Sequence, residues 1–434
     1  MNAMAKPVLF IVYLSTLVSA LLRESILAEE IETEVNDMES YVALGGSGDF
    51  EHVGPDPEEK EKERWPKGWK ATIKDNISPR LTNGWIDTQT WRNFTSRIPK
   101  ANGEPVTLEY VTAEGSGDRG GILFCNGHGE FAEKHAETIS DFLEAGFSPV
   151  YSMDWRGQGR SSRLLNDTWK SHVEKFDDFA EDLQQFVSIV DADLTENSKG
   201  TTRNFFLVCH SLGCAITFRY LIKEYYAQRP IVFNAVVGNA PFLLPRTAPV
   251  PMSVTLSKIV LGVMVRLGYG NSYAPMMGKP LEMKYGYDIN APDRLNVFQE
   301  KMCYGDRYRK YAAGHYGSCI GDPTANMVKE MLRNYDFIKE FLSTGGNLSV
   351  PILIQQAKTL EDGSDGDVMN GPQEDFCKHV GSCTMTKYKK GDHGLLHETD
   401  VLRRQVLDDI YRFLDIKAGF KAIQSPLPEQ RLHP

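Results

Sequence analysis

Short apolar runs alternate with amphipathic stretches along the chain from about residue 85 onward. The run Gly121–Cys125 is apolar throughout, as expected for a strand covered on both faces, whereas Val106–Val111 alternates as an antiparallel strand does. Leu212–Tyr225 has a helical pattern. Further strands are predicted at 148–153, 204–209, 231–238, 350–354 and 384–388, and further helices at 132–145, 173–190, 374–378 and 398–414. This β-α-β-α rhythm predicts an α/β fold with a doubly wound parallel sheet.

The strand–helix rhythm breaks after Phe242 and resumes near Val350. The residues between carry helical patterns and Pro/Gly turns but no clear buried strand. We therefore expect one sheet interrupted by a helical insertion. The expected segments are a first core part at 85–242, a helical insertion at 243–347, a second core part at 348–416 and a C-terminal tail at 417–434.

The N-terminus is typical of a targeting segment. Lys6 precedes an uncharged run at 7–22, and Val18-Ser19-Ala20 offers small residues at a cleavage site. The run is shorter than the ~20 residues that span a bilayer. We predict a cleaved signal peptide at residues 1–20, with an uncleaved membrane anchor as the alternative, and a mostly disordered acidic leader at 21–84. Secretion, or residence in the secretory lumen, follows from this interpretation. Four Asn-x-Ser/Thr sites agree weakly with it: Asn76, Asn93, Asn166 and Asn347.

Composition and charge exclude several classes of protein. Hydrophobic residues make up 41% and charged residues 24%, which is ordinary globular usage and excludes a collagen, a mostly disordered chain and a polytopic membrane protein. Lys and Arg total 48 against 58 Asp and Glu, so the formal charge is −10. Such a chain lacks the broad positive field that nucleic-acid binding needs, and we expect no nucleic-acid partner.

Seven cysteines is an odd number, and in an oxidising compartment some of them should pair. Three lie in or beside apolar runs and are expected as buried free thiols: Cys125, Cys209 and Cys214. For the other four we favour local pairing, Cys377 with Cys383 and Cys303 with Cys319.

A candidate nucleophile follows one of the predicted strands. Ligands bind at the carboxyl ends of strands in such sheets, and Cys209-His210-Ser211-Leu212-Gly213 occupies one such end. A serine on a sharp strand-to-helix turn is lifted out of the sheet, provided that small residues stand two positions before and after it. Gly213 meets this need, and Cys209 replaces the usual glycine. The alternative role of Ser211 is a helix N-cap.

A serine nucleophile needs a base that is held by an acid, and in this fold they follow in the order Ser, Asp or Glu, His. Asp365 and Asp367 follow a later strand, and His393 lies in a Gly-rich loop after the next one. This order favours a Ser211 nucleophile and a His393 base. His397 lies four residues after His393 but no third metal ligand is evident, so we expect neither a metal nor a cofactor.

The oxyanion that forms on an attacked carbonyl needs hydrogen-bond donors. One is expected to be the backbone N–H of Leu212, which follows the nucleophile. The other is expected to be the backbone N–H of His128, in a loop where two glycines let the backbone come close: Asn126-Gly127-His128-Gly129-Glu130.

Together these segments resemble a known family. The loop at 126–130, Asp154-Trp155-Arg156-Gly157-Gln158-Gly159-Arg160-Ser161, the serine turn and His393-Gly394-Leu395-Leu396-His397-Glu398 look like α/β-hydrolases of the lysophospholipase L2 and monoacylglycerol lipase group, serine hydrolases of the serine aminopeptidase S33 type. Tyr308-Arg309 and Gly321-Asp322-Pro323-Thr324 add to the resemblance, which spans residues 85–415. It implies an α/β-hydrolase fold, with a mostly parallel eight-stranded sheet, helices on both faces and an inserted helical cap.

The resemblance also implies roles for residues. Ser211 is the nucleophile, His393 the base and, by position relative to Phe376-Cys377, Asp365 the acid, with Asp367 as the alternative because the family's loop is shorter. Asn126 stands where the family has His, and we expect a structural role there. Activity should fall below about pH 6 as His393 becomes protonated.

The resemblance implies an esterase acting on a monoacyl lipid, such as a lysophospholipid or a monoglyceride. The Met-, Val- and Leu-rich stretch at 252–268 is expected to line an acyl-chain pocket, to rest on a membrane surface or to pack on the core. An acyltransferase or a peptidase with the same three residues, and a non-catalytic binding protein of this fold, stay as alternatives.

Overall fold

The computed structural model describes residues 90–197, 204–246, 253–275, 277 and 320–419. Several predicted features lie outside these residues: the signal peptide, the leader, Asn76, the Cys303–Cys319 pair and Tyr308-Arg309.

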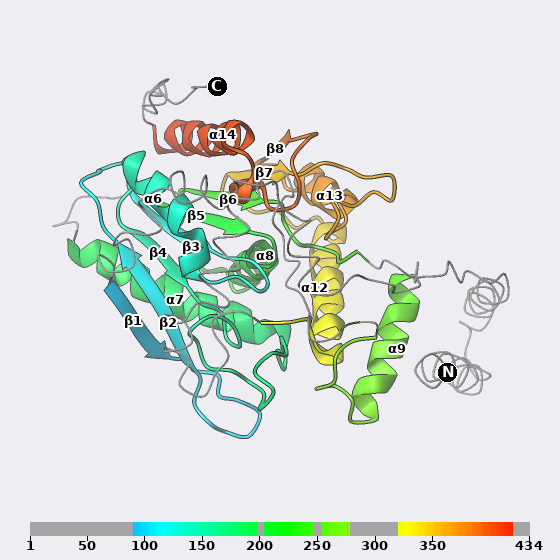
Figure 1. The fold of residues 1–434 in the computed structure, drawn as a ribbon. Helices are drawn as coiled ribbons and strands as arrows, with labels where there is room; N and C mark the ends of the chain where they lie inside the picture. The colour runs from blue at the N-terminus through cyan, green and yellow to red at the C-terminus, as the bar shows by residue number, and fades with distance from the viewer. Residues whose placement is uncertain (1–89, 198–203, 247–252, 276, 278–319, 420–434) are drawn as a thin grey trace, which may run out of the picture. The chain divides into compact units, whose positions relative to one another are not determined.

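An eight-stranded sheet forms the centre of the described chain (Figure 1). Its spatial order is β1-β2-β4-β3-β5-β6-β7-β8; β1 and β2 pair antiparallel, β2 and β4 pair antiparallel, and all other neighbours are parallel. The prediction of a mostly parallel eight-stranded sheet is therefore confirmed. The strands are β1 (Thr90–Thr95), β2 (Thr107–Ala113), β3 (Gly121–Cys125), β4 (Val150–Met153), β5 (Phe205–His210), β6 (Ala235–Asn239), β7 (Ile352–Gln356) and β8 (Cys383–Lys387).

Helices cover both faces of the sheet (Figure 1). The apolar sides of α7 and α8 build one core cluster with one face, and those of α6 and α14 build a second cluster with the other. The helices are α6 (Ala136–Glu144), α7 (Phe176–Asn197), α8 (Leu212–Tyr226), α9 (Val254–Arg266), α12 (Ala325–Ser343), α13 (Gly371–His379) and α14 (Asp400–Ala418). Helix α6 follows a 3-10 turn, η1 (Ala132–His135).

The strands that carry the site were predictable because burial on both faces makes them apolar. Every residue of β3 and β5 is buried, and their register pairs Cys125 with Cys209. The edge strand β1 was not predicted. Most of its residues are exposed, so it lacks the apolar pattern of the inner strands.

Two helices of the predicted insertion lie among the described residues. Helix α9 buries Leu256, Val260, Leu261 and Met264 and contacts α12. Helix α12 also contacts α7 and α8 and contributes to the first core cluster. The buried side of α9 thus packs on α12, which itself belongs to the predicted insertion, and the three expected environments for 252–268 stay predictions.

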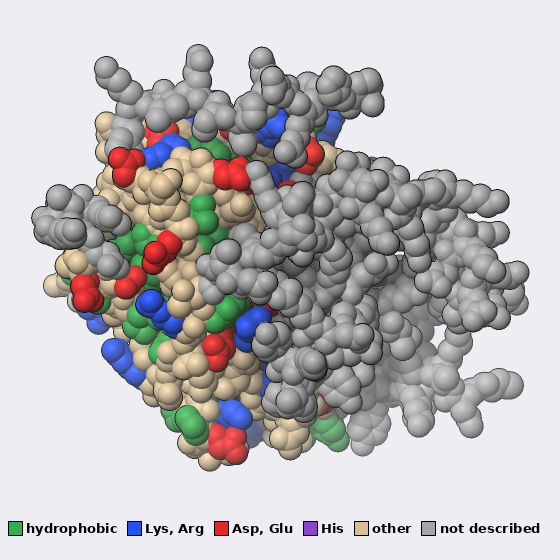
Figure 2. Space-filling view, turned by 60° about the vertical axis from the view of Figure 1, so that its left-hand side comes forward, with side chains coloured by type: hydrophobic (Ala, Val, Ile, Leu, Met, Phe, Trp, Pro, Cys, Tyr) green, Lys and Arg blue, Asp and Glu red, His purple; other side chains and the backbone are tan. Residues whose placement is uncertain are grey.

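No helix in the described ranges combines the length and the apolar character needed to cross a bilayer. Acidic and basic side chains are intermixed on the face of the molecule in Figure 2.

Candidate active site

Ser211 occupies a strained turn between β5 and α8. Its backbone φ is +48° and ψ is −119°, outside the regions that non-glycine residues ordinarily adopt. A Cβ at Gly213 would collide with the carbonyl oxygens of Cys125 and Asn126, so glycine is needed there. The Ser211 hydroxyl makes no capping hydrogen bond to α8, which leaves the N-cap alternative without support.

The hydroxyl of Ser211 instead meets an imidazole. Its Oγ lies 2.8 Å from Nε2 of His393, whose Nδ1 lies 2.8 Å from Oδ2 of Asp365. The other oxygen of Asp365, Oδ1, accepts the backbone N–H groups of Asp367 and Val368, both at 3.0 Å. These bonds orient a carboxylate that is only 2% exposed. The Asp367 side chain, the sequence alternative for the acid, is exposed, and its backbone helps to hold Asp365.

Asp365 and His393 each favour the charged form of the other. Burial alone would lower the pKa of His393, but the charge and hydrogen bond of Asp365, with smaller effects from Asp367 and Glu130, raise the pKa to about 9. Burial alone would raise the pKa of Asp365, but His393 and the backbone hydrogen bonds keep it below its usual value. The expectation that activity falls below about pH 6 used the ordinary pKa of histidine and did not include the effect of Asp365.

The loop that was expected to supply an oxyanion donor lies next to the serine turn. The Gly127 N–H donates to Glu130 Oε2 at 2.6 Å, and the Gly129 N–H donates to Gln158 Oε1 at 2.7 Å. Within the described chain, no protein acceptor takes the intervening N–H of His128. The same holds for the N–H of Leu212, which as the first residue of α8 has no intrahelical acceptor.

A buried carboxylate, that of Glu130, joins the pieces of the site. Its Oε2 accepts from His135 Nε2 at 2.9 Å and lies 3.0 Å from His210 Nδ1, and its Oε1 accepts from Lys134 Nζ at 2.5 Å. The other nitrogen of His210 lies 3.2 Å from the backbone oxygen of His393. The Glu130 side chain thus links the oxyanion loop to His210, and His210 in turn contacts the loop that carries His393.

Three of these groups also have a spacing compatible with metal binding, since ligand atoms of Glu130, His135 and His210 lie within 4.8 Å of one another. The ammonium of Lys134 already pairs with the carboxylate at the centre. Burial would raise the pKa of Glu130, but Lys134, His135 and His210 hold it well below its usual value. We interpret the group as an ion-pair network. His397 is buried, with its ring centroid 4.7 Å from that of His135.

Asn126 and Asp154 support the loops around the site. The side-chain amide of Asn126 donates to the backbone carbonyl of Met153 at 3.0 Å, which fits the expected structural role. The backbone carbonyl of Asn126 accepts from the Trp155 indole at 2.8 Å. The Asp154 carboxylate accepts the backbone N–H groups of Ala132 and Arg160 at 2.8 and 2.7 Å. Burial raises the pKa of Asp154 to about 6 despite these bonds.

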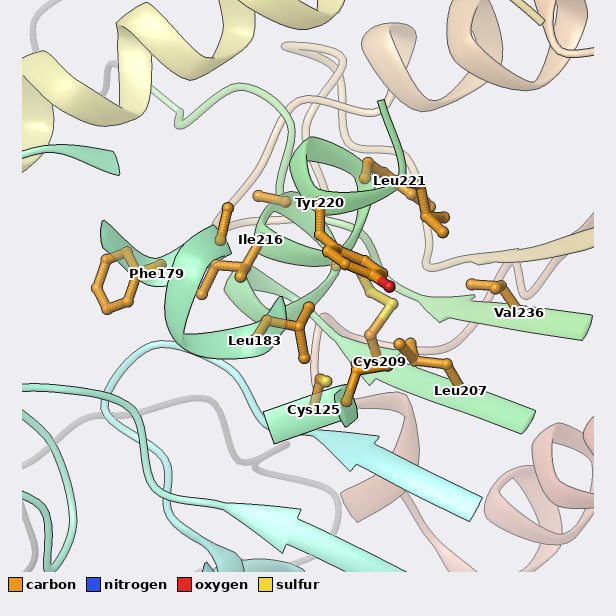
Figure 3. Close-up of a cluster of buried hydrophobic side chains, with 14 of the residues drawn as sticks. Cys125, Phe179, Leu183, Leu207, Cys209, Ile216, Tyr220, Leu221 and Val236 are labelled. Atoms are coloured by element: carbon orange, nitrogen blue, oxygen red, sulfur yellow. A yellow bond between two sulfur atoms is a disulfide. The ribbon is translucent and has the colours of Figure 1, made fainter. Parts of the chain in front are cut away.

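The cysteines around the nucleophile differ from the prediction. Cys209 and Cys214 form a disulfide that spans the serine turn, so the expectation of two free thiols there was wrong (Figure 3). The reason is geometric: the turn folds α8 back over β5 and brings the two Cα atoms to 4.9 Å, within disulfide range. Cys125 is a buried free thiol, and the predicted pair Cys377–Cys383 is present.

Comparison with known families agrees with this geometry. The profile of the family described as serine aminopeptidase, S33, matches residues 117–400, which is more than half of the chain. The chain belongs to this family.

Several curated proteins and solved structures similar to this chain are also hydrolases. Lysophospholipase L2 of Escherichia coli (strain K12) is 25% identical over 364 residues, covering 80% of this chain and 95% of the relative. The probable lysophospholipase L2 of Haemophilus influenzae is 26% identical over 301 residues, covering 68% and 84%. A soluble variant of monoglyceride lipase from Saccharomyces cerevisiae shares the fold, with a TM-score of 0.51, 15% identity and coverage of 77% and 96%. A carboxyl esterase from Bacillus coagulans has a TM-score of 0.51, 15% identity and coverage of 76% and 99%. Together, the family and the curated relatives identify an α/β-hydrolase of the lysophospholipase type, a serine ester hydrolase, and the solved structures share its fold.

Proposed function

We propose that this chain hydrolyses carboxylic esters of monoacyl lipids through an acyl-enzyme on Ser211. The observation that carries the proposal is the unbroken hydrogen-bonded series from Asp365 through His393 to Ser211, with 2.8 Å at each step. A serine hydroxyl becomes an effective nucleophile when a neighbouring base takes its proton, and the base works when a carboxylate fixes its tautomer.

The reaction follows the family's serine chemistry. His393 Nε2 accepts the Ser211 proton as Oγ attacks the ester carbonyl, and Asp365 stabilises the imidazolium that forms. The backbone N–H groups of His128 and Leu212 bind the oxyanion. The alcohol leaves with the proton from His393. A water, activated by the same imidazole, then cleaves the acyl-enzyme and frees Ser211.

The relatives guide the choice of substrate. Lysophospholipase L2 and monoglyceride lipase are names for enzymes that act on lipids with a single acyl chain, and we infer the same class here. The purified protein should be assayed on lysophosphatidylcholine, lysophosphatidylethanolamine, monoolein, triolein and peptide p-nitroanilides in parallel, with Ser211→Ala as the control. Hydrolysis confined to the monoacyl lipids and absent from Ser211→Ala supports the proposal. Preferential cleavage of peptides would favour the peptidase alternative.

An acyltransferase differs from a hydrolase only in what attacks the acyl-enzyme. The same assay with added glycerol or lysolipid as acceptor measures transfer products by mass spectrometry. We expect free fatty acid as the main product. Dominant acylation of the acceptor would contradict the hydrolase assignment while keeping the role of Ser211.

We further infer that the cap contacts the lipid surface that holds the substrate. Three large apolar side chains after α9 are exposed: Leu267 at 60%, Tyr269 at 57% and Met277 at 43%. Burying such side chains in a membrane interface removes apolar area from water. In vesicle sedimentation, a Leu267→Glu, Tyr269→Glu double variant should bind less than the wild type while keeping its activity on a soluble p-nitrophenyl ester. Equal vesicle binding would contradict the contact.

Secretion is also proposed. Disulfides persist in oxidising compartments, and two occur in the described chain. The asparagines of three predicted glycosylation sites are exposed: Asn93, Asn166 and Asn347. Expression in a eukaryotic secretory host should give a glycosidase-sensitive protein in the medium whose N-terminus begins after residue 20. Retention in the cytosol with an intact N-terminus would contradict this.

A further inference from the structure

Residues 127–130, called the oxyanion loop below, contact Ser171, and Ser171 is hydrogen-bonded to the base of the cap. The cap base is the stretch at 320–324, which leads into α12. Ser171 forms a parallel bridge with this stretch: its N–H donates to the Asp322 carbonyl at 3.2 Å, and its carbonyl accepts from the Thr324 N–H at 2.9 Å. Thr324 also caps α12, because its side chain accepts from the Met327 N–H. These bonds tie the backbone of Ser171 to the start of α12.

The His128 side chain spans the gap between the oxyanion loop and this bridge. Its Nε2 lies 2.8 Å from the Ser171 Oγ, and Ser171 is only 1% exposed. Burial lowers the pKa of His128 to about 4, against the opposing charges of Asp322, Glu130 and Asp367, so the ring is neutral at working pH. Ile320 of the cap base lies near the same loop, since a Cβ built on Gly129 would lie 4.0 Å from the Ile320 Cγ1.

The loop needs such restraint because His128 stands between two glycines. Glycine has wide backbone freedom, and Gly129 has φ of +69°. Glu130 fixes the N–H of Gly127, and Gln158 fixes the N–H of Gly129. The first of these anchors lies within the loop itself, and the second lies in the loop after β4. Among the described residues, the side chain of His128 provides the hydrogen bond from this loop to the bridge that holds the cap base.

We propose that the His128 imidazole is a positioning group that couples the seating of the cap base, through Ser171, to the geometry of the oxyanion hole. The inference rests on the proposed function, because it assigns the His128 N–H to the oxyanion. A donor stabilises the oxyanion only when it is placed to within a fraction of an ångström, so the side chain acts on the transition state and leaves the binding of intact ester nearly unchanged.

The test removes the hydrogen bond from either end. Ser171→Ala and His128→Leu should each lower kcat on a soluble p-nitrophenyl ester by about tenfold with KM nearly unchanged, less than the 10²–10³-fold that follows complete loss of an oxyanion donor. Affinity for a trifluoromethyl ketone, which forms a tetrahedral adduct with the serine, should fall by the same factor. Affinity for a non-reactive ether analogue of the ester should not. His128→Gln, which keeps a hydrogen-bonding group at similar reach, should recover part of the loss.

Two controls separate positioning from general destabilisation. Ser148→Ala removes another buried hydroxyl, one that bonds the backbone of Gly115, and should lower stability without changing the ketone affinity. The double variant His128→Leu, Ser171→Ala should lose no more kcat than Ser171→Ala alone, because both changes remove the same His128–Ser171 hydrogen bond and only Ser171→Ala also removes the contact of this hydroxyl with Met327.

The outcomes distinguish failure of the His128–Ser171 coupling from failure of the proposed ester hydrolysis. Additive losses, equal losses for the ether and the ketone, or unchanged kcat in both single variants would overturn the coupling while ester hydrolysis by the wild type stands. If the wild type hydrolyses no ester, the proposed function fails and the coupling fails with it.

Discussion

At the scale of residues, the strained backbone of Ser211 is the feature that sets the chemistry. A non-glycine residue with φ of +48° costs free energy that the surrounding packing must offset. Two contacts hold the turn in place. Gly213 packs against the end of β3, and the backbone carbonyl of Asn239 accepts the Ser211 N–H at 3.1 Å. The result is a hydroxyl presented to His393 above the edge of the sheet.

The acid can be tested by replacing each candidate in turn. Asp365→Asn keeps the shape but removes the charge and the preference for the correct imidazole tautomer, so kcat should fall on the order of 10⁴-fold. Asp367→Asn should retain most of kcat at high pH, because its exposed side chain makes no hydrogen bond to His393 among those described. Steady-state kinetics on a soluble ester measures both. The reverse ranking would assign the acid to Asp367.

The pH profile tests the charge environment of His393. The base must be neutral, and its pKa in the free enzyme is raised to about 9, so kcat/KM should rise with pH and level off above a midpoint near 9. Asp367→Asn removes a negative charge that favours the imidazolium, so its midpoint should lie at lower pH. A midpoint near 6 for the wild type would show that Asp365 and its neighbours do not raise the pKa as the structure indicates.

At the scale of elements, the sequence predicted a strand or turn best where a single physical constraint determines which residues can stand there. Burial on both faces makes β3 and β5 apolar, and the serine turn needs Gly213, so the position of Ser211 was predictable. The edge strand β1 was not, because its exposed residues carry no comparable pattern. Glu130 was visible in the sequence only as the last residue of the oxyanion loop. Its contacts with His135 and His210 depend on how η1 and β5 meet in space, which spacing along the chain does not encode.

The disulfides lie on different elements and should differ in accessibility. Cys209 and Cys214 are fully buried, whereas Cys377 and Cys383 are partly exposed. In the native protein, a water-soluble reductant followed by alkylation should label Cys377 and Cys383 and leave activity intact, because this pair lies apart from Ser211. Labelling of Cys209 and Cys214 should require denaturation before reduction. Mass spectrometry of the labelled peptides measures this.

The same experiment without reductant tests the pairing itself. Denatured, unreduced protein should yield alkylated Cys125 but no alkylated Cys209 or Cys214. Recovery of alkylated Cys209 under these conditions would show that the turn carries free thiols, as the sequence alone suggested.

At the scale of the whole molecule, buried ion pairs connect segments that lie far apart in the sequence. The Arg156 guanidinium donates to both carboxylate oxygens of Asp182 at 2.5 and 2.8 Å and to the Ser96 hydroxyl at 2.9 Å. These bonds join the loop after β4, helix α7 and the end of β1. The Asp182 and Arg156 side chains are both nearly inaccessible to water.

Arg156→Met would leave the Asp182 carboxylate buried without its partner. We expect the free energy of unfolding to fall by about 3–5 kcal/mol, as for other broken buried pairs. The control is Lys387→Met, which removes an exposed pair with Glu374 and should change stability by less than about 0.5 kcal/mol. Urea unfolding followed by circular dichroism measures both. Equal effects of the two changes would contradict the bracing role of Arg156.

In the proposed mechanism, the Ser211 hydroxyl takes the acyl group of the substrate. Rapid acid quench during turnover of a p-nitrophenyl ester, followed by tandem mass spectrometry, reveals which residue carries the acyl mass. We predict a single adduct on Ser211 that accumulates within the first turnover and is missing from Ser211→Ala. An acyl group on any other residue, or unimpaired turnover by Ser211→Ala, would contradict it.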